Sequence, residues 1–334
     1  MTNNLTPLIS PIILSTTMSQ LKPEGGGYSR VDNPTRLLLE KKLAKLEKVK
    51  FALAFSSGSA AIATILSTLK TGDQIICHQE TYEGTLRLLK KVFTKFGIKV
   101  KLTDIRKLKS VDRQTKLIWF ENITNPTLEI INVKKICQKL KQEKTLIVVD
   151  NTFTTPIFQN PLVEGADIVV HSLTKFIAGH HDVSAGAIML NNKQIFKQLK
   201  FLQHTIGAVP SPFDCFLINR SLETLEIRMK QHQANAQKIT NFLKTCNHIL
   251  KVSFPGFSGI VSFWVKGNQQ TTLKFLSRLK HIKIAHSLGG TISTILHPAS
   301  MMTLSIPIDR NLVRLSVGLE NSKIIINDLK QALR

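Results

Sequence analysis

The sequence predicts an α/β fold in which a large domain, built on a mostly parallel sheet, precedes a smaller α+β domain. Between residues 51 and 190, short apolar runs alternate with helical patterns, which is typical of a parallel sheet covered by helices on both faces. After about Arg220 the pattern changes to one long helix, short strands and a closing helix. A chain of 334 residues, 43% of them hydrophobic, is long enough for about two such domains.

Seven apolar runs are the expected strands of the large domain. They are FALAF (51–55), QIIC (74–77), IKVKL (98–102), KLIWF (116–120), TLIVV (145–149), DIVV (167–170) and SAGAIML (184–190). Helical patterns follow Gly58 and Gly84, and a longer one covers residues 220–246. We therefore divide the chain into an N-terminal arm (1–34), a large α/β domain (35–219) and a smaller α+β domain (220–334).

Composition and charge argue against several classes of protein. No apolar stretch reaches the roughly 18 residues of a membrane helix. The N-terminus lacks the basic region of a secretory signal, so we expect a cytoplasmic protein with no membrane partner. The four cysteines are scattered without CxxC spacing, which argues against a disulfide framework and a zinc cluster. The net charge of +23 comes from lysines spread along the whole chain, which indicates a solvated basic surface and no specific nucleic-acid partner.

Small polar residues follow the first expected strand. In open α/β sheets, ligands bind beyond the carboxyl ends of the strands. Ser57, Gly58 and Ser59 stand at such a point and open a helix. Unpaired backbone N–H groups and the positive end of the helix dipole suit a phosphate there. Because serine at a helix start is common for capping alone, this motif by itself is a weak indication.

Two ionisable residues follow later strands. Asp150 closes the fifth run, and Lys175 lies beyond the sixth in a turn that also holds Ser172 and Thr174. A partly buried carboxylate needs a cationic partner, and a desolvated lysine has a lowered pKa that suits a Schiff-base nucleophile. Each residue alone also has an ordinary explanation as a cap, a turn residue or a solvated lysine. Together they supply an anchor amine, a pyridinium partner and a phosphate cradle, the parts that pyridoxal 5'-phosphate (PLP) requires.

Longer motifs resemble one known family. Residues 148–189 resemble the cofactor signature of the Cys/Met-metabolism PLP enzymes, and residues 28–47 resemble that family's YSR-x-x-NPT element. The motifs FSSGSAA, GDQIICHQETYEGT, ENITNPTLE, FLQHTIGAVPSPFDC and LVRLSVGLE follow in the family's order. The resemblance implies the PLP-dependent transferase fold, which is aspartate-aminotransferase-like and is also called fold type I.

The resemblance also implies roles for the matching residues. Lys175 is expected to hold the cofactor covalently and to carry protons, Asp150 to pair with the pyridine nitrogen, and Tyr82 to stack on the ring and assist catalysis. The other expected cofactor contacts are Ser57, Gly58, Ser59, Asn125, Ser172, Thr174 and, from a neighbouring subunit, Tyr28 and Arg30. The expected substrate contacts are Arg314, which would clamp an α-carboxylate, and Ser287.

The function implied by the resemblance is PLP-dependent trans-sulfuration at the γ-carbon of a sulfur amino acid or a homoserine ester. The expected enzyme is a homo-oligomer, a dimer of dimers, with an amino-acid substrate and no metal. The segment GAVPSPFDC favours cystathionine γ-lyase or cystathionine γ-synthase chemistry and leaves both open. Cystathionine β-lyase, O-acylhomoserine sulfhydrylase and methionine γ-lyase chemistries are further alternatives.

Several features depart from the family pattern near the substrate. Ile292 stands where many relatives have a glutamate, and Met302 and Thr303 stand in place of a Thr-His pair. The segment FPGFSGIVSF (254–263) fuses two motifs that relatives keep apart. These changes leave a degraded, non-catalytic relative as an alternative hypothesis. A basic nucleic-acid-binding protein is a more distant one.

Overall fold

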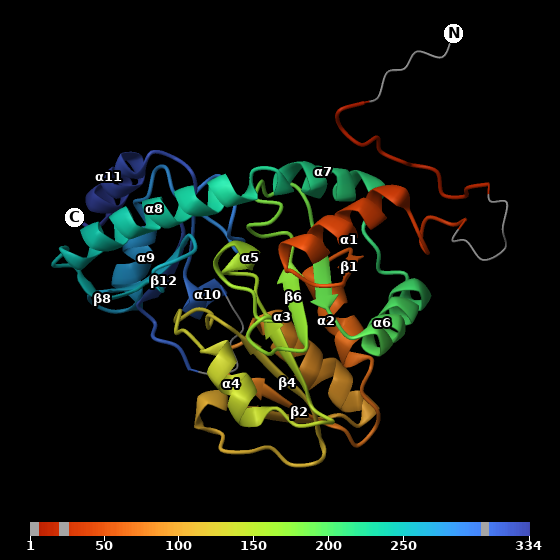
Figure 1. The fold of residues 1–334 in the computed structure, drawn as a ribbon. Helices are drawn as coiled ribbons and strands as arrows, with labels where there is room; N and C mark the ends of the chain where they lie inside the picture. The colour runs from red at the N-terminus through yellow and green to blue at the C-terminus, as the bar shows by residue number, and fades with distance from the viewer. Residues whose placement is uncertain (1–6, 20–26, 302–306) are drawn as a thin grey trace, which may run out of the picture.

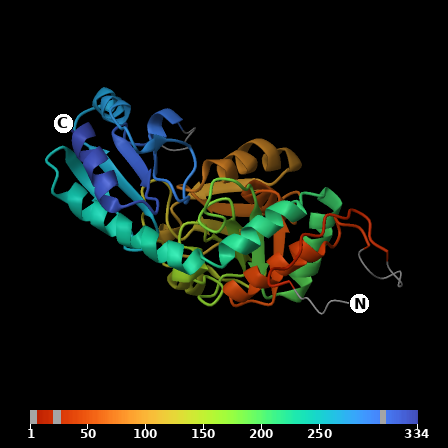
Figure 2. The same ribbon diagram turned by 90° about the horizontal axis from the view of Figure 1, so that it is seen from above.

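Two β-sheets, one in each half of the chain, organise the fold (Figure 1). The computed structural model describes residues 7–19, 27–301 and 307–334. Seen from above, the two halves lie side by side (Figure 2). The predicted arrangement of a large α/β half and a smaller α+β half is confirmed.

The larger sheet has seven strands in the order β1-β7-β6-β5-β4-β2-β3. They are β1 (Phe51–Phe55), β2 (Gln74–His78), β3 (Lys99–Thr103), β4 (Thr115–Glu121), β5 (Leu146–Asp150), β6 (Ile168–Ser172) and β7 (Gly186–Leu190). The pairs from β3 to β6 are parallel, and β7 is antiparallel to both of its neighbours. The central strands are buried on both faces, which explains why each reads as a continuous apolar run.

Helices cover this sheet and connect its strands. They are α1 (Pro34–Leu46), α2 (Gly58–Leu66), α3 (Glu83–Arg87), α4 (Val133–Leu140), α5 (Thr155–Phe158), α6 (Lys193–Ile206) and α7 (Pro212–Leu222). The helix expected after Gly84 is interrupted. It continues from α3 as a π-helical turn over Leu88–Val92 and a 3-10 turn over Phe93–Phe96, and Gly97 ends it at φ 75°. Val92 and Phe93 are β-branched and aromatic residues that form α-helix poorly, which agrees with the break.

The smaller sheet has five strands in the order β10-β11-β12-β9-β8. They are β8 (Ile249–Ser253), β9 (Ile260–Val265), β10 (Lys283–Ile284), β11 (Thr294–Leu296) and β12 (Leu312–Ser316). The helices of this half are α8 (Leu225–Lys244), α9 (Gln269–Ser277), α10 (Pro298–Met301) and α11 (Ser322–Ala332). No helix among the described residues is long and apolar enough to cross a bilayer.

The long helix α8 connects the two halves (Figure 1). Its first turns place Leu225 and Met229 in a core cluster of the larger half. Its later turns place Ala236 and Ile239 in the core of the smaller half. The expected domain boundary after residue 219 falls inside α7. The helical pattern over residues 220–246 therefore covers the end of α7 and the whole of α8, which residues 223–224 separate. The division into domains stays a prediction.

Candidate active site

A cavity of about 470 Å³ lies at the carboxyl ends of the parallel strands. Residues of both halves of the chain line it, as expected for a site at the edge of an open α/β sheet. Eleven of the thirteen predicted site residues line this cavity: Ser57, Gly58, Ser59, Tyr82, Asn125, Asp150, Ser172, Thr174, Lys175, Ser287 and Arg314. The structure therefore brings together residues that are more than 250 positions apart in the sequence.

Tyr28 and Arg30 are the two predicted residues that do not line the cavity. The Arg30 guanidinium carbon lies 5.5 Å from the centroid of the Tyr28 ring, and its Nη1 donates to the backbone oxygen of His204. Tyr28 is exposed. Their expected role at a neighbouring subunit's site stays a prediction.

The start of α2 forms one end of the cavity. Ser57 caps the helix, its Oγ accepting from the backbone N–H of Ala60 at 3.1 Å. A Cβ at Gly58 would lie 3.1 Å from the Cβ of Ser172, and a Cβ at Gly186 would lie 2.3 Å from the Ser57 backbone oxygen. Glycine at both positions lets β6 and β7 approach the helix start closely. The first N–H groups of α2 have no partner within the helix, so this concave end suits a phosphate.

The hydroxyl groups beside this helix start differ in their bonding. The Thr174 Oγ1 accepts from the backbone N–H of Ala185 at 2.9 Å and donates to the oxygen of the same residue at 3.2 Å. Its bonding capacity is thus mostly used within the chain. Ser172 uses its backbone N–H to donate to Thr152 Oγ1, and no partner of its own hydroxyl occurs among the described residues. Ser172 is the better placed of the two to contact a phosphate.

Two carboxylates lie next to each other at the ends of β4 and β5. Glu121 and Asp150 are opposite each other in the strand register, and both are buried. The Asp150 Oδ1 accepts from the backbone N–H and the hydroxyl of Thr152, at 3.0 and 2.5 Å. Glu121 accepts from the backbone N–H of Tyr82. No lysine or arginine lies within ion-pair distance of Asp150 in the part of the chain that the structure describes.

Burial determines the ionisation of this carboxylate pair. It raises the pKa of Asp150, against the hydrogen bonds from Thr152. It raises the pKa of Glu121 well above its usual range, and the charge of Asp150 raises it further. Asp150, a buried acid without a lysine or arginine partner among the described residues, fits a ligand that brings its own positive charge, such as the protonated nitrogen of a pyridine ring.

Glu121 is a site residue that the sequence interpretation missed. It closes the apolar run KLIWF in the same way that Asp150 closes TLIVV, so the same signal was present. Its position as a carboxylate at the end of a buried strand was sufficient reason to predict Glu121 as a site residue.

We expect the Glu121→Gln variant to be more stable than the wild type at pH 8. Glutamine keeps an acceptor for the Tyr82 N–H but cannot ionise. An acid whose pKa is raised by folding stabilises the fold below its unfolded pKa and loses that contribution as pH rises. The gain in free energy of unfolding should be about 1–3 kcal/mol at pH 8 and should vanish near pH 4. Urea unfolding of the cofactor-free protein at both pH values measures it, and an equal gain at both would contradict the prediction.

Arg314 provides a buried positive charge on β12 at the other side of the cavity. Its Nη1 donates to Asn125 Oδ1 at 2.8 Å, and its Nε has no partner among the described residues. Burial lowers the pKa of Arg314 to about 10, against the effect of the Glu121 charge. A buried guanidinium with unused N–H groups suits a carboxylate, which it can bind bidentately.

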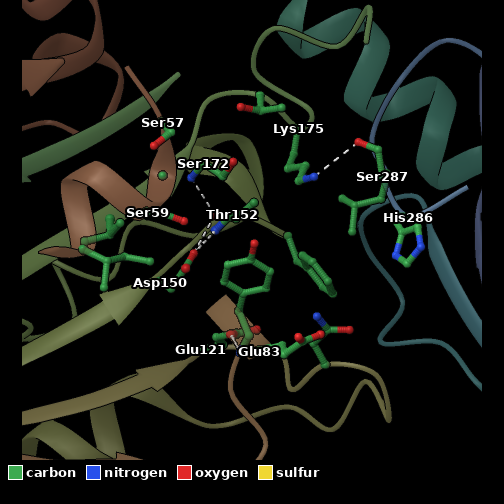
Figure 3. Close-up of a pocket in the computed structure, with 18 of the residues that line it drawn as sticks. Ser57, Ser59, Glu83, Glu121, Asp150, Thr152, Ser172, Lys175, His286 and Ser287 are labelled. Carbon is green, nitrogen blue, oxygen red and sulfur yellow. Dashed lines mark hydrogen bonds between the residues drawn. The ribbon is translucent and has the colours of Figure 1, made fainter. Parts of the chain in front are cut away.

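Lys175 lines the same cavity as Asp150 and Arg314. Its Nζ donates to Ser287 Oγ at 3.2 Å, across the cavity from the smaller half of the chain (Figure 3). Burial, followed by the charge of Arg314, lowers the pKa of Lys175 to about 8. This pKa is close to the value at which a lysine is an effective nucleophile and proton carrier near neutral pH. Ser287 lines the cavity and contacts the lysine, and its expected contact with the substrate stays a prediction.

Tyr82 stands at the mouth of the cavity at the start of α3. Its side chain is 43% exposed, and a Cβ at Gly84 would lie 2.3 Å from its ring. The absence of a side chain at Gly84 thus allows the ring to lie over α3. Ile292, one of the departures from the family, is exposed and is not among the residues that line the cavity. Met302 and Thr303 lie outside the described residues.

Comparison with known sequences gives close relatives. The chain is 42% identical over 360 residues to the cystathionine gamma-lyase of Macaca fascicularis, an alignment that covers 98% of this chain and 88% of the relative. It is 41% identical over 359 residues to the Homo sapiens cystathionine gamma-lyase, with 98% and 89% covered.

Comparison with solved structures and with protein families agrees. MetB from Corynebacterium glutamicum superposes with a TM-score of 0.93 at 37% identity, covering 98% of this chain and 93% of that one. Yeast cystathionine gamma-lyase superposes with a TM-score of 0.91 at 38% identity, with the same coverage of both chains. The PLP-dependent transferase fold implied by the sequence motifs is thereby confirmed. Residues 3–334 match the profile of the family described as Cys/Met metabolism PLP-dependent enzyme, and the chain belongs to this family.

Proposed function

We propose that the protein catalyses the cystathionine γ-lyase reaction. In this reaction L-cystathionine and water give cysteine, 2-oxobutanoate and ammonia, the bond between the γ-carbon and sulfur being broken. The observation that carries the proposal is the arrangement of Lys175, Asp150 and Arg314 around one cavity, in a chain whose relatives at 41–42% identity are named cystathionine gamma-lyase. Cystathionine γ-synthase activity is the second candidate, because the structure of MetB superposes with a TM-score of 0.93.

The residues of the cavity fit PLP and would divide its binding among them. The N–H groups at the start of α2 and the Ser172 hydroxyl would hold the phosphate, Asp150 would hold a proton on the pyridine nitrogen, and the Tyr82 ring would cover the cofactor. Bound PLP supplies an electron sink that makes the substrate Cα–H and then the Cβ–H acidic. Arg314 would bind the substrate α-carboxylate, and the Lys175 amine would carry protons at Cα and Cβ.

Product analysis with purified protein tests the proposal. Incubation with L-cystathionine should release cysteine and 2-oxobutanoate. Homocysteine and pyruvate would instead show β-lyase chemistry, and formation of cystathionine from an O-acylhomoserine and cysteine without lyase activity would show the synthase. Intact visible absorption of bound PLP without turnover of any of these substrates would support a non-catalytic relative.

The pKa of Lys175 predicts the pH dependence of cofactor uptake. Only the neutral amine attacks the PLP aldehyde, so the uptake rate of cofactor-free protein should rise roughly tenfold per pH unit and level off above about 8. The Arg314→Gln variant removes a charge that lowers this pKa, so its midpoint should lie at higher pH. The Arg314→Lys variant keeps the charge and serves as the control. A rate independent of pH between 6 and 9 would contradict the assignment.

We further propose that the active unit is a homo-oligomer, a dimer of dimers in the cytoplasm, in which Tyr28 and Arg30 complete a neighbour's site. The exposure of Tyr28 and its place outside its own cavity support this. Mixed after unfolding and refolding, inactive Lys175→Ala and Arg30→Ala chains should regain roughly a quarter of wild-type activity, because half of random dimers contain one complete site. Failure to regain activity on mixing would rule out a shared site.

A further inference from the structure

We propose that one face of α8, formed by Arg228, His232 and Asn235, is a positioning device that fixes the segment carrying Lys175 relative to the segment carrying Arg314. The inference rests on the proposed function. The three residues lie four and three positions apart on one helix, so they share a face, and all three are buried. None of them lines the cavity. They act through backbone groups of the two segments.

Arg228 holds the turn that follows Lys175. Its Nη1 donates to the backbone oxygen of Phe176 at 2.6 Å, and its Nη2 donates to that of Ile177 at 3.0 Å. A Cβ at Gly179, where φ is +71°, would lie 2.0 Å from the same Nη1, so the turn closes directly around the guanidinium. Arg228 pairs with no carboxylate in the described chain. Lysine cannot replace the planar Arg228 guanidinium, whose several N–H groups bind more than one carbonyl oxygen at once.

His232 and Asn235 hold the segment that follows β12. His232 Nδ1 lies 2.7 Å from the backbone oxygen of Val317, and because a carbonyl only accepts, this nitrogen is the donor. Burial lowers the pKa of His232 to about 4, so the ring is neutral and its tautomer is fixed. The ring also packs edge-on against Phe176, with centroids 5.1 Å apart. Asn235 donates to the oxygen of Gly318 at 3.1 Å.

A third segment is enclosed between these two. The backbone N–H of Gly289 donates to Ser316 Oγ at 2.8 Å. A Cβ at Gly289, where φ is +80°, would lie 2.7 Å from the backbone nitrogen of Phe176. Ser287, two residues earlier, contacts the Lys175 amine. The lysine turn and the end of β12 are therefore both bonded to one face of α8, and the Ser287 segment contacts both of them.

Apolar packing alone does not require these polar groups. Leu225 and Met229 already anchor α8 in the larger half, and Ala236 and Ile239 anchor it in the smaller one. Buried polar side chains cost stability unless they are hydrogen-bonded, and their directional bonds then define one geometry. Here these bonds define the position of Lys175, the proton carrier, relative to Arg314, which would bind the substrate carboxylate.

The holoenzyme variant Arg228→Lys tests the proposal, with Lys238→Met on the exposed face of the same helix as control. We expect kcat per cofactor-bound site to fall about 10- to 100-fold, with KM within about threefold, because a small misplacement of a reacting group lowers kcat while the clamp still binds substrate. We expect faster amide hydrogen exchange in residues 176–179 and unchanged exchange in the strands of the larger sheet.

A second variant keeps the test decisive if the first does not fold. His232→Phe removes only the bond to the Val317 oxygen and preserves the aromatic contact with Phe176, and it should lower kcat per site about tenfold. Unchanged kcat per site in a folded variant would overturn the proposal. So would a loss of activity that only follows a loss of bound cofactor, because that is a stability effect. A wild type that does not act on L-cystathionine refutes the proposed function instead, and the hydrogen-exchange comparison still tests the positioning device.

Discussion

The Lys175→Ala variant is expected to lose the visible absorption of covalently bound cofactor and to cleave L-cystathionine at least about 10³-fold more slowly than the wild type. Lys175 is the only lysine that lines the cavity among the described residues, so no other amine is available to hold the cofactor or to carry a proton there. Absorption spectra and kcat of the purified variant measure both effects.

Ser287→Ala is the matched control for the lysine variant. It removes the 3.2 Å contact with Nζ but leaves the amine in place. We expect it to keep the cofactor absorption and to retain kcat within about tenfold, since the loss of one hydrogen bond is worth about 0.5–1.5 kcal/mol. A Lys175→Ala protein with an unchanged spectrum would refute the central assignment.

The Asp150→Asn variant should show the second-largest effect, a fall in kcat of about 10²–10³-fold. Removing one partner of a buried charge pair costs about 3–5 kcal/mol, and the pyridine nitrogen would no longer be kept protonated. Asparagine preserves an acceptor for the two bonds from Thr152, so the local structure should survive. Steady-state kinetics with saturating PLP measure the effect.

Thr152→Val separates charge from local geometry in that experiment. It removes the hydroxyl bond to Asp150 and the acceptor for the Ser172 N–H but leaves the carboxyl group in place. Its kcat should fall by no more than about tenfold. If Thr152→Val and Asp150→Asn are equally impaired, hydrogen bonding and not charge is the important property of Asp150.

The larger half of the fold could be predicted from the sequence because its central strands are buried on both faces. β5 reads LIVVD and ends at Asp150, so the apolar run TLIVV indicates both the strand and the site residue that follows it. Gly58 was assigned in the same way, from its position at a strand-to-helix turn. The break of the helix after α3 was missed, because it depends on a balance of weak local preferences that the helical pattern outweighs.

Other parts of the site depend on contacts between distant segments. Nothing near Lys175 in the sequence indicates that Ser287 would bind its amine, because 112 residues separate them. The polar face of α8 was equally hidden, since Arg228 and His232 in a helical pattern resemble solvated residues. Only the fold shows that these side chains are buried and that backbone oxygens surround them.

The position of α8 in both hydrophobic cores also determines how the protein unfolds. If the smaller half unfolds and α8 unfolds with it, the core of the larger half loses Leu225 and Met229. If the larger half unfolds in the same way, the core of the smaller half loses Ala236 and Ile239. The two halves should therefore unfold together in one cooperative transition, and neither should fold when produced as a separate chain. A chain damaged in the smaller half would lose its larger half as well. It would then be recognised and degraded as an unfolded protein, and it would not persist as a half-folded species that sequesters PLP.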